Sequence, residues 1–210
     1  MITVMARCLL AGLLFLALCP VPAFGQSAAL LDAHNRFTAL YAEGRYQEAL
    51  SFAKEALSLG EREFGPGHPN TATLLGSLAQ LYHAQGRYAE AEPLFVRALA
   101  IMETTLGPNH RSVAASLNNL AALYHAQGRY AEAEPLFLRV LEMREAALGP
   151  EHAEVTQSLN NLGTLYQARG NYAEAEPLYL RARSIVEVVL GPDHPSLATS
   201  LNSLGAALSS

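Results

Sequence analysis

Hydrophobic residues in the middle of the chain recur at the spacing of an α-helix. Leu117, Leu120, Ala121 and Tyr124 occupy positions i, i+3, i+4 and i+7, which lie on one face of a helix. Gly128 follows them, and glycine favours turns over helix interiors. The spacing therefore predicts a helix that ends close to Gly128.

A second helical pattern begins directly after this glycine. It ends at Gly149-Pro150, because a glycine followed by a proline is a signal for the end of a helix. The apolar positions of this pattern are Tyr130, Ala133, Phe137, Val140 and Leu141. The two patterns together predict a pair of helices joined by a tight turn, in which small residues such as Ala121 and Ala133 let the backbones approach closely.

This predicted helix pair is repeated along the chain with a period of 42 residues. Residues 86–94 recur almost unchanged at 128–136 and 170–178. A Gly-Pro step also recurs, and a histidine stands two positions after each of its prolines: His68, His110, His152 and His194. Repeats of this length are typical of solenoids, in which each unit packs against its neighbours.

The repeated pattern Leu-Asn-Asn-Leu-Ala-x-Leu-Tyr-x-x-x-Gly-x-Tyr-x-x-Ala-x-Pro-Leu, found at residues 117–136, resembles the tetratricopeptide repeat. The similarity is to the 42-residue form of kinesin light chains and their bacterial relatives. It implies an all-α fold, a right-handed α-solenoid of stacked helix-turn-helix repeats. Each second helix should continue through its proline (Pro93, Pro135 or Pro177) with a mild bend.

The repeat domain is predicted to span residues 26–210. It comprises a degenerate unit at 28–63, units at 68–107, 110–149 and 152–191, and a half unit at 194–210. The first unit departs from the pattern because Arg36 and Phe37 replace a leucine and a small residue, and Ala53 replaces an aromatic residue. Atypical terminal units are common in solenoids, where they cap the stack.

Residues 1–25 are predicted to be a secretory signal peptide, with cleavage before Gln26. Arg7 precedes an apolar run at residues 8–18, and Ala23 and Gly25 are the small residues that a cleavage site requires. A membrane anchor is the less favoured alternative, because it needs about 20 apolar residues. We therefore expect an exported protein, periplasmic or secreted, without stable membrane insertion.

The composition argues against nucleic acid as a partner and against catalysis. The net charge is −5 and Lys54 is the sole lysine, so no basic stripe for a phosphate backbone is present. Sequence signatures of metalloproteases, serine hydrolases and P-loop enzymes are missing, and the only aspartates are Asp32 and Asp193. We predict no enzyme activity, no catalytic residues and no cofactor.

The four periodic histidines are interpreted as structural residues. Zinc ligands must lie within about 4 Å of one another, whereas packed helix axes are about 8 to 10 Å apart. The histidines therefore cannot share one metal ion. We predict that each precedes the start of a helix, with Pro69 and Pro195 shaping the first turn.

The resemblance also implies a peptide-binding groove. In tetratricopeptide stacks the first helices of successive units line a concave groove, to which positions two, five, six, nine and twelve of each helix point. The residues implied are Thr73, Ser77, Gln80, His83, Asn118, Asn119, His125, Gln157, Asn160, Asn161, Thr164, Gln167 and Asn202. Since they include no lysine or arginine, acidic ligands are in doubt.

Two interpretations of the groove asparagines remain open. Their amides can donate to and accept from an extended peptide backbone, or they can satisfy only neighbouring helices and water. Under the first interpretation, replacing Asn118 and Asn160 by alanine should weaken binding and leave stability almost unchanged, because exposed polar positions contribute little.

The predicted function is a non-enzymatic scaffold that binds a peptide or protein partner in the groove. The alternative is a structural module that self-associates through residues 195–210. Leu197, Leu201, Leu204 and Leu208 have helical spacing there, and an unpaired apolar face is typical of interaction sites.

Overall fold

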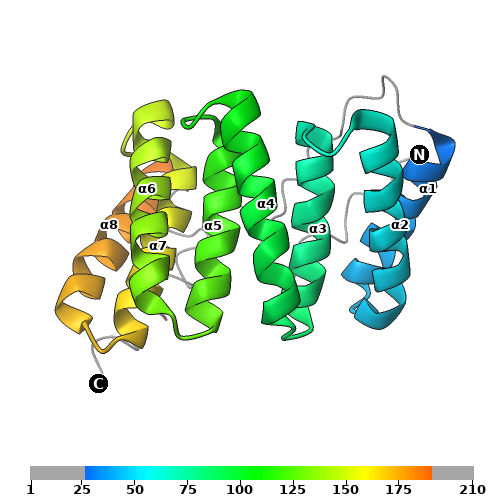
Figure 1. Cartoon of the computed structure of the whole chain (residues 1–210). Coiled ribbons are helices and arrows are strands. Elements are labelled where there is room, and N and C mark those ends of the chain that lie inside the picture. The colour runs from blue at the N-terminus through cyan, green and yellow to red at the C-terminus, as the bar shows by residue number, and fades with distance from the viewer. Residues whose placement is uncertain (1–26, 191–210) are drawn as a thin grey trace.

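The computed structural model describes residues 27–190, which form a row of antiparallel helix pairs (Figure 1). The pairs are α1 (Ala28–Ala42) with α2 (Tyr46–Phe64), α3 (Pro69–Ala84) with α4 (Tyr88–Leu106), α5 (Arg111–Ala126) with α6 (Tyr130–Leu148), and α7 (Ala153–Ala168) with α8 (Tyr172–Leu190). The predicted signal peptide, the half unit at 194–210 and Asn202 lie outside the described residues.

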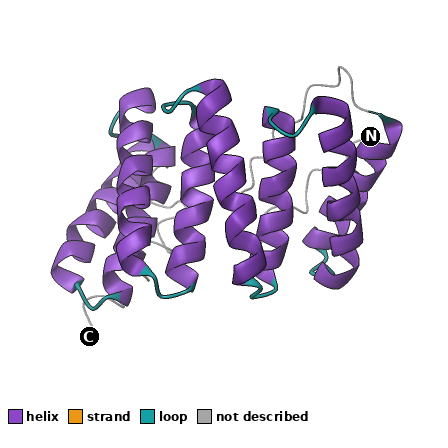
Figure 2. Ribbon diagram, viewed as in Figure 1, coloured by secondary structure: helices purple, strands orange, loops and turns teal. Residues whose placement is uncertain are grey.

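Each helix packs on the helix before it and the helix after it. Contacts run within each pair and from each second helix to the next first helix, as in α2 with α3 and α4 with α5. Every regular element of the described residues is a helix, and short turns join them (Figure 2). The predicted all-α fold of stacked helix pairs is therefore confirmed.

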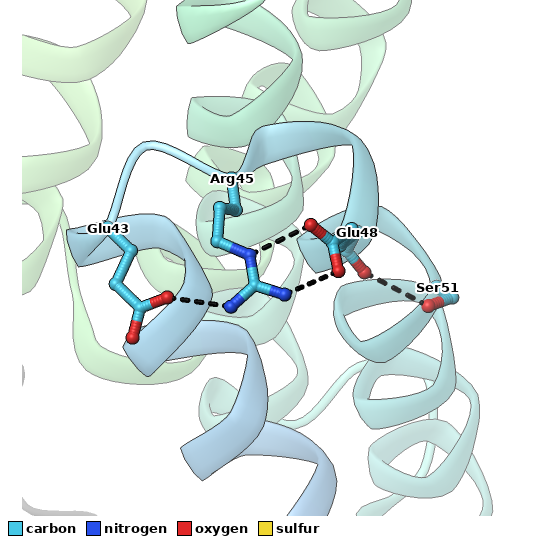
Figure 3. Close-up of polar contacts among 4 residues, drawn as sticks. All are labelled: Glu43, Arg45, Glu48 and Ser51. Carbon is cyan, nitrogen blue, oxygen red and sulfur yellow. Dashed lines mark hydrogen bonds and ion pairs between the residues drawn. The ribbon is translucent and has the colours of Figure 1, made fainter.

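The turn within each of the first three pairs is built from a glycine and an arginine. Gly44 has φ +73°, a conformation that glycine adopts without steric cost. The next residue, Arg45, donates from Nε to Glu48 Oε1 at 2.8 Å and from Nη1 to Glu43 Oε2 at 2.9 Å (Figure 3). These groups are exposed, so the ion pairs shape the turn but contribute little stability.

The same arrangement recurs in later turns and explains several glutamates. Arg129 bonds Glu132 at 2.7 Å in its own unit and Glu92 of the preceding unit at 2.6 Å. Arg87 likewise pairs with Glu90 at 2.7 Å. Glutamates near the start of the second helices are therefore ion-pair partners of these turn arginines.

Three of the periodic histidines precede the starts of first helices, as predicted, and the structure shows that they are the N-caps of those helices. Nδ1 of His68, His110 and His152 accepts a hydrogen bond from the backbone N–H two residues later, at 3.1, 3.1 and 3.2 Å respectively. Each bond satisfies one N–H that the helix itself leaves without a partner. His194 lies outside the described residues.

A second set of arginines connects consecutive units. Arg139 in α6 pairs with Glu103 in α4 at 2.7 Å and donates to the Pro108 carbonyl at 3.1 Å. The same two contacts recur with Arg97 and Arg181. Each arginine therefore joins its own second helix to the second helix of the preceding unit, and also to the Gly-Pro step at the end of that preceding helix.

The second helices continue through their prolines, as predicted. Pro93 lies inside α4, and Pro135 and Pro177 lie inside α6 and α8. A proline removes one backbone donor, yet each of these helices is continuous and packs against neighbouring helices.

One pair of core positions in each of the first three units combines a large side chain with a small one. Ala79 and Phe95 share one buried cluster, and Ala121 and Phe137 share another. In the first unit the sizes are exchanged: Phe37 lies on the first helix and Ala53 on the second, and both are buried. The unit predicted to be degenerate therefore keeps the packing of the others with its aromatic residue moved to the partner helix.

Candidate functional site on the first helices

The predicted groove residues of α3, α5 and α7 form what we call the first-helix face. It consists of Thr73, Ser77, Gln80, His83, Asn118, Asn119, His125, Gln157, Asn160, Asn161, Thr164 and Gln167. They recur at equivalent positions of three helices that occupy the same place in their pairs. None of them is an acidic residue, a lysine or an arginine, so the face carries no fixed charge.

These side chains differ widely in exposure. Thr73, Gln157 and Thr164 are exposed, whereas Ser77, Gln80 and Asn118 are buried, with 6%, 8% and 7% of their surface accessible. The remaining residues are half-buried. The expectation that Asn118 is an exposed polar position is therefore wrong.

Asn118 is buried because it bonds to the next unit. Its Oδ1 accepts a hydrogen bond of 2.8 Å from Asn161 Nδ2, which joins α5 to α7. This contact supports the second interpretation of the asparagines for this pair: the two amides satisfy each other between neighbouring helices.

In the fourth unit the same face is tied to the second helix of its own pair. The Tyr179 hydroxyl donates to Gln167 Oε1 at 3.0 Å and lies 3.3 Å from Thr164 Oγ1. Burial raises the pKa of Tyr179. The sequence analysis did not predict this contact. Its available signal was that the fourth unit has a tyrosine at the position where the second and third units have Phe95 and Phe137.

Four polar atoms on the first-helix face are buried without a hydrogen-bond partner. They are Gln80 Oε1, His83 Nε2, His125 Nε2 and Asn160 Oδ1. A buried polar group without a partner costs about 1 to 3 kcal/mol, and native structures contain few of them. They gather on one face over three successive units, which makes this face the candidate functional site of the described residues.

The two histidines of this face are held neutral by their surroundings. Burial lowers the pKa of His83, and burial also lowers that of His125 against a smaller opposing effect of the Thr164 backbone. Each ring packs against a tyrosine, Tyr88 or Tyr130, with ring centroids 5.5 Å apart. Near neutral pH each ring can therefore donate or accept one hydrogen bond without adding charge.

Within residues 27–190, no group of three or more His, Cys, Asp or Glu side chains is arranged to hold a metal ion. Over the same residues, no helix combines the length and apolar character needed to span a membrane.

Comparisons with known proteins agree with this architecture. Residues 30–104, 76–146, 112–179 and 154–210 match the family model described as Tetratricopeptide repeat. No curated protein matches the chain at a significant level.

Solved structures show the same fold. A crystal structure of a kinesin light chain with nearly identical TPR-like repeats from Podosopora anserina is 29% identical, with a TM-score of 0.75, and the match covers 86% of this chain and 85% of that one. BtubC (BKLC) from P. vanneervenii is 23% identical, with a TM-score of 0.73 and coverage of 86% and 79%. The helix pairs, their 42-residue period and the family match place this chain in the tetratricopeptide repeat family, in a form that resembles kinesin light chains.

Proposed function

We propose that this protein is a non-enzymatic scaffold that binds a protein partner, through an extended peptide segment, on the first-helix face. The tetratricopeptide repeat is typically a protein-interaction domain and is generally not catalytic. The partner is proposed to be a protein and not a nucleic acid, because the chain has no basic surface stripe.

The observation that carries the proposal is the set of unpartnered atoms at Gln80, His83, His125 and Asn160. An extended peptide presents an N–H and a C=O at every residue, so its backbone can pair with amides and neutral imidazoles. Since the face has no fixed charge, neutral main-chain groups suit it better than carboxylates or ammonium groups, which need a counter-charge when buried.

The test is a crosslinking pull-down from the compartment in which the protein resides, made with wild type and with an Asn160→Ala, His125→Ala double variant. We expect a specific partner to crosslink to wild type and to be depleted with the double variant. A matched variant of exposed residues on two second helices, Glu142→Ala in α6 with Ser184→Ala in α8, should retain it. Equal capture by both variants would exclude the first-helix face as the binding surface.

We further propose that the protein is exported and begins at Gln26 in its mature form. The proposal is supported by Arg7, the apolar run at residues 8–18 and the small residues Ala23 and Gly25. N-terminal sequencing of the protein from culture medium or periplasm tests it. An intact Met1 on the purified protein would contradict it.

Self-association through residues 195–210 is the second candidate function. It is favoured by the helical spacing of Leu197, Leu201, Leu204 and Leu208, and by the scarcity of charge there: Asp193 is the only charged residue from Pro192 onward. Sedimentation over a range of concentrations, with a Leu204→Glu, Leu208→Glu variant beside wild type, should show an oligomer only in wild type.

A further inference from the structure

At one position of the first helices, the second unit has a glycine where the other units have a polar residue. His34, Gly76, Asn118 and Asn160 are spaced by 42 residues and therefore occupy equivalent places in α1, α3, α5 and α7. Three of them carry a polar side chain. Gly76 carries none, so the row has a gap in the second unit.

The space beside Gly76 is open. A Cβ atom at this position would have no neighbouring heavy atom within 4 Å. The two other glycines inside helices show the opposite: a Cβ atom would lie 2.3 Å from Leu74 Cδ1 at Gly60 and 2.8 Å from Tyr179 Cε1 at Gly163. Close packing therefore explains Gly60 and Gly163 but does not explain Gly76, whose presence in a helix interior lowers stability relative to alanine.

One turn along the same helix, a buried polar atom of Gln80 lacks a hydrogen-bond partner. Gln80 lies one turn after Gly76 on the same helix face, and side chains of a helix lean toward its N-terminus. The Gln80 side chain therefore leans toward the turn that contains Gly76. It is 8% exposed, and its Oε1 has no hydrogen-bond partner.

A second unpartnered atom lies one further turn along. His83 Nε2 is buried without a partner, and His83 follows Gln80 by three residues on the same face. Ser77, next to Gly76, is already satisfied, because its Oγ donates to the Thr73 carbonyl at 3.1 Å. Open space beside Gly76 and two unused polar groups therefore follow one another along α3.

We propose that the gap at Gly76 receives one side chain of the bound peptide, and that this side chain bears an amide or a hydroxyl group that bonds to Gln80 and His83. This inference rests on the proposed function and adds a specificity site to it. Asparagine is the reference for size, because Asn118 and Asn160 occupy the equivalent positions of the third and fourth units.

The chemistry of the neighbouring groups excludes the other classes of side chain. A buried carboxylate or ammonium would have no counter-charge on this face, and an apolar side chain would leave Gln80 Oε1 unpaired. The site therefore selects asparagine, glutamine, serine or threonine over charged and apolar residues.

The experiment uses the mature protein and a positional-scanning library of fluorescent nonapeptides, with affinities measured by fluorescence anisotropy. With wild type, we expect one library position to favour amide and hydroxyl side chains by about five- to tenfold over alanine, the range for one neutral hydrogen bond. Gly76→Asn fills the gap with the residue of the later units and should abolish this preference while binding at the other positions persists.

Two further variants separate the gap from general effects on the fold. Gly67→Asn, at a loop glycine that also has open space beside it, should leave the preference intact. Gln80→Leu keeps the gap but removes the amide, so the preference should move to apolar side chains. Circular dichroism should show the helical content of wild type in all three.

The outcomes distinguish this inference from the proposed function. If no library peptide binds wild type, both fail. If peptides bind but Gly76→Asn and Gly67→Asn behave alike, or if charged side chains are preferred at the position that Gly76→Asn affects, the gap at Gly76 is not the specificity site, and the first-helix face remains the binding surface.

Discussion

The ring of Tyr179 occupies the place where a side chain at position 163 would begin. A Cβ atom on Gly163 would lie 2.8 Å from Tyr179 Cε1 and 2.9 Å from Cζ, and the ring is held there by the hydrogen bond from its hydroxyl to Gln167. The second and third units have an alanine and a phenylalanine at these two positions. Glycine and tyrosine have therefore replaced them together in the fourth unit.

We expect Gly163→Ala to lower the free energy of unfolding by about 1 to 3 kcal/mol, because it overfills the space beside Tyr179. Adding Tyr179→Phe should recover part of this loss. Without the hydroxyl, the ring can shift to a position equivalent to that of Phe137 beside Ala121 in the third unit. Urea unfolding of the two single variants and the double variant measures the coupling. Strictly additive losses would show that the two positions do not constrain each other.

Asn118 is now expected to contribute to stability. Asn118→Ala leaves Asn161 Nδ2 without its acceptor, and the loss of such a bond costs about 0.5 to 1.5 kcal/mol. Its half-buried neighbour Asn119 provides the control, for which we expect a change within about 0.5 kcal/mol. Thermal unfolding of both variants decides: an Asn118→Ala protein as stable as Asn119→Ala would remove the structural role.

Replacing a capping histidine should weaken the helix that it begins. His110→Ala removes the acceptor of the Ser112 N–H, and losing an N-cap costs about 1 kcal/mol. His110→Asn supplies another acceptor at the same position and should retain most of the stability. If chemical denaturation gives alanine and asparagine variants of equal stability, the imidazole is not acting as a cap.

Acid should destabilise the fold through the histidines of the first-helix face. The pKa values of His83 and His125 are lowered from 6.5 by burial, so protons bind more tightly to the unfolded chain and stability rises with pH in this range. Their contribution is complete above pH 6.5 and is lost as the pH falls below 6.5 toward their lowered values.

The measurement is the urea midpoint between pH 5 and 8. A variant with His83→Gln and His125→Gln, which introduces the residue found at the equivalent position 167, should have a flatter profile than wild type. The Arg-paired carboxylates Glu90 and Glu132, whose pKa values are lowered from 4.5, act mainly below this window. Parallel profiles for wild type and variant would contradict the assignment.

The helices, their order and the caps could be predicted because each leaves a local signal in the sequence. Each signal concerns only a few neighbouring residues, as in the apolar spacing of a helix, the turn at Gly128 and the helix start after His110. The 42-residue period repeats each signal along the chain. The match of the histidine caps to the structure follows from the same locality.

The burial of the predicted groove residues could not be predicted from the sequence, because it depends on which side chains meet between units. Asn118 and Asn119 are adjacent and identical in type. Only Asn118 is buried, with 7% of its surface accessible, and it accepts a hydrogen bond from the next unit. Arg144 is a further case: it replaces Met102 of the preceding unit and donates to Ser158 Oγ at 2.8 Å in a half-buried place between α6 and α7. Pairwise contacts of this kind have no periodic signature.

The exchange of large and small side chains between Phe37–Ala53 and Ala79–Phe95 limits how this array can be rearranged. A chimera that joins α1 to α4 would place two phenylalanines where one fits, and one that joins α3 to α2 would leave two alanines and a cavity. The first overfills the core at about 1 to 3 kcal/mol, and the second loses about 3 to 5 kcal/mol. Duplication or recombination in this gene therefore preserves this core packing only when whole helix pairs move together. If a unit changed from one arrangement to the other by single substitutions, an intermediate with two phenylalanines would lose less stability than an intermediate with two alanines.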